Sequence, residues 1–373
     1  MSRLFPTGVP VLGKDLAGRV NEKEKIKQLL RAGQSVVLYG PRRIGKTSIA
    51  LTILDELKSE NFFTGNVDIF ESTALSILSQ RIVETTLANK KLAKTIQALK
   101  SSLSAAISKI EIKNVVNDFE WILKFAESST KSYDLFSNAL DFPEQFSKKY
   151  GKHMIMFIDE IGDIARFNGD DFIKLMRSKF QLQKHVTYLF AGSHESVIKN
   201  IFVKKTGPFY RFGQLFAVDA IEKESFKIFI QDKFNQVNQQ VEESALDTLL
   251  DLTNGHPYYT QLLCRELYFY ALSQKKIIDI EAVEIAISEA IKLEELYFAS
   301  LWEDVSKNSA QVVVLQALVE NRESLFKKDM KVKVNVTRTL NRLIKKGILK
   351  KNKKGQYEFT DLLFRKYIKE RLL

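Results

Sequence analysis

The sequence predicts an α/β protein in which a mostly parallel sheet is followed by a helical domain and a small C-terminal domain. In the first half, short apolar runs alternate with helical stretches, which is the pattern of a parallel sheet. From residue 223 to about 292 the pattern is purely helical. After Ser306, three helical segments and a hairpin pattern look like a winged helix-turn-helix. These changes place the domains at residues 1–218, 219–305 and 306–373.

Five apolar runs are the predicted strands of the sheet. They are Ser35–Tyr39, Asn66–Phe70, Met154–Ile158, Val186–Ala191 and Gln214–Val218. The third and fourth runs are apolar throughout rather than alternating, as expected for strands covered on both faces. Residues 71–150 are helical and polar, and we interpret them as an amphipathic insertion that covers one face of the sheet.

The C-terminal domain is predicted from three helical segments and one turn signal. The helices are expected at Gln311–Val319, Leu325–Met330 and Asn335–Lys346. After Gly347, the segments ILKK and QYEF flank the turn NKKG, which predicts a β-hairpin with a basic tip.

Composition excludes several classes of protein. The chain of 373 residues is too long for one core, and 45% hydrophobic and 27% charged residues are typical of a soluble globular protein. The single cysteine, Cys264, excludes a disulfide framework or a cysteine zinc site and favours a reducing compartment. We find no apolar run long enough to span a membrane and no export signal at the N-terminus. We therefore expect a cytoplasmic protein without a membrane partner.

The positive charge is confined to one end of the chain. The net charge is +12, and residues 326–373 hold sixteen basic and four acidic residues, so the first 325 residues are neutral. This asymmetry favours a module that faces a polyanion.

A phosphate-binding motif follows the first predicted strand. Its pattern G-x-x-x-x-G-K-T is formed by Gly40, Pro41, Arg42, Arg43, Ile44, Gly45, Lys46 and Thr47, and Ser48 is next in the chain. The glycines let the backbone curl so that its N–H groups face a phosphate at a helix N-terminus. We expect Lys46 to bridge the β- and γ-phosphates of ATP and the Thr47 hydroxyl to bind Mg²⁺.

Further polar residues stand at the ends of two later strands. The run Met154–Ile158 ends in Asp159 and Glu160, and parallel strands bring such ends to the sheet edge where the P-loop lies. We expect Asp159 to hold Mg²⁺ through water and Glu160 to polarise the attacking water, which favours hydrolysis over storage of the nucleotide. Ser193, after the fourth strand, either orients that water, senses the γ-phosphate or caps a helix.

Together these segments resemble the archaeal-type ATPase family within the AAA+ and STAND branches of P-loop NTPases. The P-loop with its paired arginines and the Ile-Asp-Glu-Ile segment at 158–161 are similar to the family's phosphate and acidic motifs. The segment around Gly18 and Arg19 resembles the family's N-terminal motif, which packs near the adenine. The resemblance runs almost end to end, and it implies a P-loop NTPase sheet with a helical lid and a C-terminal winged helix.

Two further site residues follow from this resemblance. Arg211 stands in a segment that resembles the one supplying the family's arginine finger, acting within one subunit or on a neighbour in an oligomer, although the family's preceding glycine is missing. Residues 253–258 resemble the Gly-x-Pro motif that begins a STAND lid helix, which implies that His256 and Pro257 lie against the nucleotide phosphates. Without the resemblance, Arg211 reads as a surface residue and His256 as a helix cap.

The third predicted helix of the C-terminal domain carries a polar, basic face opposite its apolar one, as a recognition helix does. That face consists of Arg338, Asn341, Arg342 and Lys345. The hairpin adds Lys351, Lys353 and Lys354. Double-stranded DNA is the favoured partner, held mainly through its phosphates. A regulatory protein partner, an autoinhibitory contact with the ATPase domain, or a solvated face are the alternatives.

The sequence thus predicts a slow ATPase that binds ATP or ADP with Mg²⁺ and whose nucleotide state controls a DNA-binding winged helix. The alternative is a nucleotide-dependent signalling or scaffold switch whose winged helix binds protein. A replication-initiator-like loader shares the architecture, but the sensor asparagine and lid arginine usual in that family are not seen.

Overall fold

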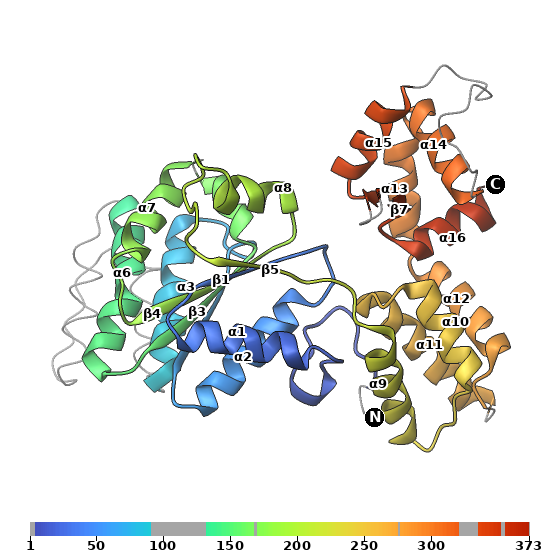
Figure 1. Ribbon diagram of the computed structural model, residues 1–373, viewed down its shortest axis with the longest axis horizontal. Coiled ribbons are helices and arrows are strands. Elements are labelled where there is room, and N and C mark those ends of the chain that lie inside the picture. Colours follow the sequence, from blue (N-terminus) through green and yellow to red (C-terminus); the bar gives the residue numbers. More distant parts are fainter. Residues whose placement is uncertain are drawn as a thin grey trace, which may run out of the picture. The chain divides into compact units, whose positions relative to one another are not determined.

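The computed structural model describes residues 4–90, 132–167, 170–274, 277–320, 335–351 and 355–372 (Figure 1). The chain divides into two compact units. The first, called the sheet unit below, comprises Pro10–Asp219, and the second, called the helical unit, comprises Met1–Val9 and Ala220–Leu373. In the part of the chain that is described, no helix has the length and apolar character needed to cross a membrane.

The sheet unit contains five parallel strands in the order β2-β3-β4-β1-β5. They are β1 (Val36–Tyr39), β2 (Phe63–Asp68), β3 (Met154–Asp159), β4 (Val186–Gly192) and β5 (Gln214–Ala217). The predicted parallel sheet is confirmed, but β2 begins at Phe63, three residues before the predicted start. Its residues alternate between buried and less buried positions, so its first half lacks the continuous apolar signal of β3 and β4.

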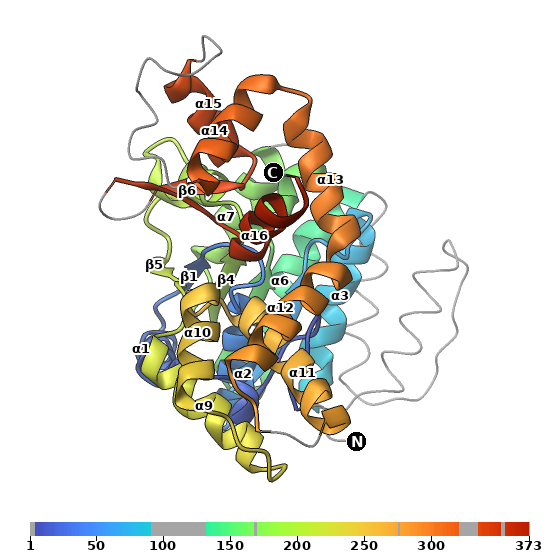
Figure 2. The ribbon, with the colours of Figure 1, turned by 90° about the vertical axis from the view of Figure 1, so that its right-hand side faces the viewer.

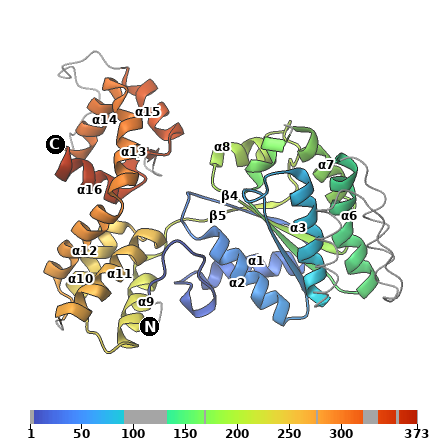
Figure 3. The ribbon, with the colours of Figure 1, turned by 180° about the vertical axis from the view of Figure 1, so that it is seen from behind.

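Helices cover both faces of the sheet (Figures 1 and 3). One face packs against α1 (Val20–Arg31) and α2 (Lys46–Ser59), and the other against α3 (Leu75–Leu87), α6 (Ser132–Tyr150) and α7 (Asp170–Phe180). β3 and β4 are buried along their whole length, because alternate side chains enter the two cores. The double coverage expected from their apolar runs is confirmed.

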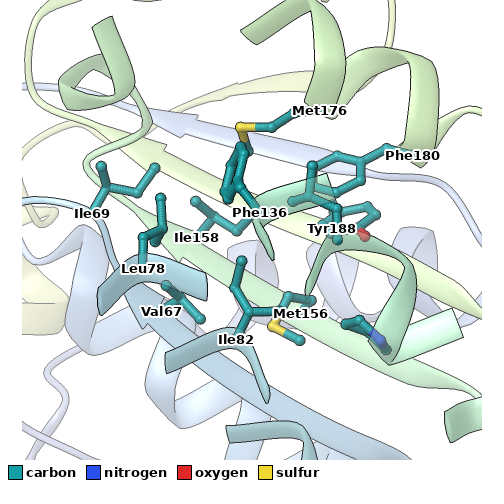
Figure 4. Close-up of a pocket in the computed structure, with 12 residues that line it drawn as sticks. Val67, Ile69, Leu78, Ile82, Phe136, Met156, Ile158, Met176, Phe180 and Tyr188 are labelled. Carbon is teal, nitrogen blue, oxygen red and sulfur yellow. The ribbon is translucent and has the colours of Figure 1, made fainter. Parts of the chain in front are cut away.

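The core under α3, α6 and α7 is rich in aromatic side chains. α3 packs along α6 and on β2, so both helices cover one sheet face, while residues 91–131 lie outside the described part. Figure 4 shows Val67 and Ile158 of the strands and Phe136 and Met176 of the helices turned toward one apolar gap.

Short helical segments occupy the loops of the sheet unit. They are Gly13–Asp15, Ala88–Lys90, Ile161–Phe167, α8 (Glu195–Ile198) and the π-helix Lys199–Val203.

Most of the helical unit is formed by Ala220–Leu373, whose helices are coloured from yellow to red in Figure 2. Its helices are α9 (Lys223–Asn235), α10 (Glu243–Thr253), α11 (Pro257–Gln274), α12 (Ile280–Leu293), α13 (Glu295–Ser306), α14 (Ser309–Val319), α15 (Val336–Lys345) and α16 (Leu362–Arg371). A hairpin of β6 (Leu349–Lys351) and β7 (Tyr357–Phe359) lies between α15 and α16. The N-terminal segment packs here as well, with the Phe5 ring 5.0 Å from that of Phe234.

Two of the three predicted C-terminal helices and the hairpin are present, as α14, α15, β6 and β7. The predicted helix at Leu325–Met330 and residues 352–354 of the hairpin turn lie outside the described residues. α15 forms because Asn335 caps it, accepting the N–H of Arg338 at 3.0 Å, and because Leu340 and Leu343 are fully buried. The assignment of these elements to a winged helix-turn-helix stays a prediction.

Candidate nucleotide site

The loop between β1 and α2 has backbone conformations that glycine favours. Gly45 caps α2 at φ 97°, and Arg43 has φ 61°. A Cβ on Gly40 would lie 2.4 Å from the carbonyl oxygen of Val218, so only glycine fits at that position. No side chain caps α2, and the N–H groups of its first turn are therefore left for a bound anion.

Lys46, the first residue of α2, is turned into this loop. Its ammonium donates to the carbonyl oxygens of Gly40 at 3.0 Å and Pro41 at 2.7 Å, and the residue is only 5% exposed. Burial lowers the pKa of Lys46 to about 8, against the opposing effect of the Glu160 and Asp159 carboxylates. A buried ammonium bonded to neutral carbonyls can exchange them for phosphate oxygens, which stabilise its charge better.

Thr47 and Asp159 meet at the carboxyl edge of the sheet, although 112 positions separate them in the sequence. The Thr47 hydroxyl donates to Oδ2 of Asp159 at 2.7 Å, and Oδ1 of Asp159 accepts the N–H of Glu160 at 2.9 Å. Burial raises the pKa of Asp159, and these hydrogen bonds offset part of the rise. The structure therefore brings together the two residues predicted as metal ligands, a hydroxyl and a carboxylate of the kind that Mg²⁺ prefers.

Glu160 is held by Ser193 at the end of the neighbouring strand. The N–H of Ser193 donates to Oε2 of Glu160 at 3.1 Å, and its hydroxyl donates to Oε1. The alternative in which Ser193 caps a helix is not supported, because the residue at the N-cap of α8 is His194 and its side chain makes no capping hydrogen bond. Ser193 instead orients the predicted base.

A third carboxylate, missed by the sequence analysis, stands beside Asp159. Asp68 is the last residue of β2 and pairs in register with Asp159. Burial raises the pKa of Asp68, and the negative charges of Glu71 and Glu160 add to this effect. An acidic residue at the end of a strand is a recognisable sequence signal. It was missed here because the predicted strand continued to Phe70, which placed Asp68 inside the strand.

Arg19 connects the N-terminal motif to the P-loop. Its buried guanidinium donates to the carbonyl oxygens of Ile44 and Asp219 and, at 3.1 Å, to the Glu22 carboxylate. Gly18 has φ 57° and Arg19 φ 66°, so the chain enters α1 through two left-handed residues. Arg19 therefore braces the loop from inside the protein.

Some of the remaining residues of the P-loop are exposed to solvent and others are buried in the core. The exposed ones are Pro41, Arg42 and Arg43. Ile44 is buried in the core under α1 and α2. The Ser48 hydroxyl accepts the N–H of Val11 at 3.1 Å, which fixes the first residues of the sheet unit on α2.

Arg211 lies on an exposed turn before β5. It has φ 56°, and its guanidinium lies 5.4 Å from the centre of the Tyr210 ring. Within the described residues, no hydrogen bond or ion pair joins Arg211 to the P-loop or to Glu160. Its role as an arginine finger stays a prediction.

His256 and Pro257 belong to the helical unit, where Pro257 begins α11. The carbonyl oxygen of His256 accepts the N–H of Thr260, and its ring lies 4.8 Å from that of Tyr259. Gly255 has φ 66°, and a Cβ there would lie 2.1 Å from the carbonyl oxygen of Ile221. Glycine is therefore required before His256, while contact of His256 and Pro257 with a nucleotide stays a prediction.

The basic face predicted on α15 is exposed. A groove on this face is lined by Asn335, Thr337, Arg338, Asn341, Arg342 and Lys345. Lys351 of β6 is exposed, and its ammonium lies 5.6 Å from the centre of the Tyr357 ring. Lys353 and Lys354 lie outside the described residues.

A parallel sheet whose first strand runs through a glycine loop into a helix, with Thr47 facing an acid at the end of β3, defines the P-loop class of nucleoside triphosphatases. Within that class, the family model for the ATPase domain found predominantly in Archaea matches residues 16–263, and the chain belongs to this family. None of the curated proteins matches the chain.

Several solved structures share the fold. The Walker-type ATPase PABY2304 of Pyrococcus abyssi has a TM-score of 0.70 at 16% identity, with 98% of this chain and 99% of that chain covered. ORC2 of Aeropyrum pernix, solved with ADPNP and ADP, has a TM-score of 0.60 at 13% identity, with 99% and 98% covered. ORC1 of the same organism, solved in complex with DNA, has a TM-score of 0.53 at 12% identity, with 99% and 95% covered. These likenesses concern the fold alone.

Proposed function

We propose that this chain is a Mg²⁺-dependent ATPase of the AAA+/STAND type, with slow turnover, whose nucleotide state controls a DNA-binding winged helix. The domains would be the ATPase domain at 1–218, the lid at 219–305 and the winged helix at 306–373. The observation that carries the proposal is the hydrogen bond between Thr47 and Asp159, which joins the P-loop to the acidic strand end. ORC2 of Aeropyrum pernix, which shares the fold, was solved with ADPNP and ADP.

The site residues fit a magnesium nucleotide. The described residues contain no group of three His, Cys, Asp or Glu side chains that would hold a metal ion unaided, so phosphate and water would complete the shell at Thr47 and Asp159. Magnesium bound there would neutralise charge on the phosphates. Lys46 would move from its loop carbonyls to phosphate oxygens, and Glu160, oriented by Ser193, would polarise the attacking water.

The ATPase proposal is tested by two substitutions in the site and one outside it. Lys46→Ala should abolish ATP binding, while Glu160→Gln should preserve binding and abolish turnover. Glu195→Gln is the matched control, because Glu195 is exposed and, within the described residues, forms an ion pair with Lys199 alone. Normal hydrolysis by Glu160→Gln would refute the assignment of the base.

The DNA-binding part of the proposal is supported by the exposed groove on α15. Arginine and lysine side chains line the exposed face of α15, and the apolar face of this helix is buried, as in recognition helices. The net charge of the chain is concentrated in the same segment. ORC1 of Aeropyrum pernix, which shares the fold, was solved in complex with DNA.

The experiment is a titration of random duplex DNA at several salt concentrations, with ATP and with ADP. The test variant carries Arg338→Ala, Arg342→Ala and Lys345→Ala, and the control replaces the exposed Lys14, Lys25 and Lys58 of the sheet unit by alanine. The test variant should bind more weakly and with a shallower salt slope, by about one unit per lost phosphate contact.

Equal affinity of the two variants, or the absence of a salt slope, would discard DNA binding. The C-terminal module would then be the protein-binding or autoinhibitory element of a nucleotide switch. This second function has its own support in the packing of α16 on α10 and α12, which ties the module to the proposed lid.

A further inference from the structure

The first turn of α11 contacts the C-terminal module, defined here as α13–α16 with the hairpin, at two points. The Tyr258 hydroxyl donates to Oε1 of Glu294, the residue between α12 and α13. The Tyr259 hydroxyl donates to Oδ2 of Asp361, the N-cap of α16. Two adjacent tyrosines therefore contact the point where the module begins and the point where its last helix begins.

The Asp361 carboxylate accepts a hydrogen bond at each of its two oxygens. Its Oδ1 accepts the N–H of Phe364 at 2.9 Å and so caps α16, while Oδ2 accepts the Tyr259 hydroxyl. Tyr259 is 7% exposed and Asp361 is half-buried, so the hydrogen bond is partly shielded from water and is worth more than a fully exposed one. The start of α16 is thus fixed on α11 by a partly buried hydrogen bond, which is charge-assisted when Asp361 is ionised.

The helices of the module pack on one another around α16. The ring of Phe298 in α13 lies 5.7 Å from that of Phe364 and 5.5 Å from that of Tyr367, both in α16. α14 also packs on α15, which carries the basic groove. A shift of the start of α16 would therefore be transmitted to α15.

The loop that leads into α11 is bonded to the segment that leaves the sheet. The N–H of Ile221 donates to the carbonyl oxygen of Gly255 at 2.9 Å. Two residues of chain separate Ile221 from Val218, whose N–H donates to the carbonyl oxygen of Tyr39 at 2.8 Å, directly before the P-loop. The Tyr259 ring itself lies against His256, 4.8 Å between centroids.

We propose that Tyr259 is a positioning residue that couples the nucleotide site to the C-terminal module, by closing on Asp361 in one nucleotide state and releasing it in the other. The inference rests on the proposed function, because ATP and ADP are the ligands that bias the two states. Tyr259 lies outside every phosphate-binding motif, and the proposal is that it transmits the effect of the bound nucleotide to the C-terminal module. A ligand shifts such an equilibrium only by its difference in affinity for the two states.

The experiment measures amide hydrogen exchange of α16 in the full-length protein, saturated with an ATP analogue or with ADP. In the wild type, the exchange rates of the first turn of α16 should differ between the two nucleotides by about fivefold or more, which is the usual lower range of allosteric coupling. Tyr259→Phe should bring the ratio close to one, because the phenylalanine keeps the ring against His256 but cannot donate to Asp361. Tyr270→Phe, on the same helix, should leave the ratio unchanged.

A second pair of variants separates loss of the link from loss of the helix cap. Serine caps helices well but is too short to reach both partners, so Asp361→Ser should reproduce the effect of Tyr259→Phe. Asp279→Ser is its control, because Asp279 caps α12 in the same way, accepting the N–H of Ala282 at 2.9 Å. An unchanged ratio in Tyr259→Phe, or an equal loss in the Asp279 control, would overturn the proposal.

Calorimetric titration of each variant with nucleotide distinguishes the two possible failures. If the wild type binds no nucleotide, the proposed function fails and the coupling fails with it. If wild type and Tyr259→Phe bind with equal affinity and show equal exchange ratios, only the coupling fails. The readout does not require DNA, so a negative DNA titration leaves this test intact.

Discussion

Lys46 should make nucleotide binding depend on pH in a range where an ordinary lysine does not titrate. Burial lowers its pKa to about 8, whereas a bound phosphate requires the charged ammonium. Above this pKa the free protein must take up a proton in order to bind. ATP affinity should therefore be highest below pH 8 and should fall as the pH rises through that value.

The size of the effect follows from the pKa. With a pKa of about 8, about one tenth of the Lys46 amines are neutral at pH 7 and about nine tenths at pH 9. The Kd for ATP should then rise about tenfold between these two pH values, which corresponds to about 1.4 kcal/mol. A lysine with the ordinary pKa of 10.5 would change the Kd by only about 3% over the same range.

Isothermal titration calorimetry at pH 7, 8 and 9 tests this, with Mg²⁺ present and in two buffers of different ionisation enthalpy. Proton uptake on binding should grow with pH. In Lys46→Arg the guanidinium stays protonated, so the pH dependence should disappear even if binding is weaker overall. A Kd that stays constant from pH 7 to 9, or proton release on binding, would refute the reasoning.

Three further predictions concern the site and the helical unit. Gly40→Ala should destabilise the sheet unit by about 1–3 kcal/mol in denaturant unfolding, because its Cβ would lie 2.4 Å from the Val218 carbonyl oxygen; wild-type stability would contradict this. Ser193→Ala should lower kcat roughly tenfold or more at constant KM, and Ser193→Thr should restore it, whereas a change in KM alone would point to nucleotide binding. Burial raises the pKa of Asp361 to about 6, so between about pH 4 and 6 the native state binds more protons at this carboxyl than the unfolded state does. The free energy of unfolding should therefore fall as the pH rises through this range. Asp361→Asn should lose this slope, and an identical slope in both proteins would exclude Asp361 as its source.

The nucleotide loop could be predicted because its chemistry is local. The spacing of Gly40, Gly45 and Lys46 is written in eight consecutive residues, and the strand before and the helix after it have clear patterns. The meeting of Thr47 with Asp159 followed from a rule of topology, that parallel strands bring their carboxyl ends to one edge. Neither required knowledge of which strands are neighbours.

What the sequence missed depends on neighbours and on register. Glu160 and Ser193 touch because β3 and β4 are adjacent, and Asp68 lies beside Asp159 because β2 ends at that register. The contact of Tyr259 with Asp361 joins positions 102 residues apart and has no local signature. Such contacts are set by tertiary packing, which periodicity and motif spacing do not report.

Residues with strained backbone conformations coincide with part of the candidate nucleotide site, and they can be found without reference to any sequence motif. Among the described residues, seven other than glycine have positive φ, and three of them are asparagines, which tolerate this conformation: Asn61, Asn238 and Asn254. The other four are Arg19, Arg43, Glu160 and Arg211, for which the left-handed region costs about 1 kcal/mol or more each. Strain of this kind persists only where the surrounding structure imposes it, and it gathers at functional sites. All four are residues that the sequence assigned to nucleotide chemistry. For Arg211, whose segment lacks the family's glycine, the strained backbone supports a functional role on grounds independent of the resemblance.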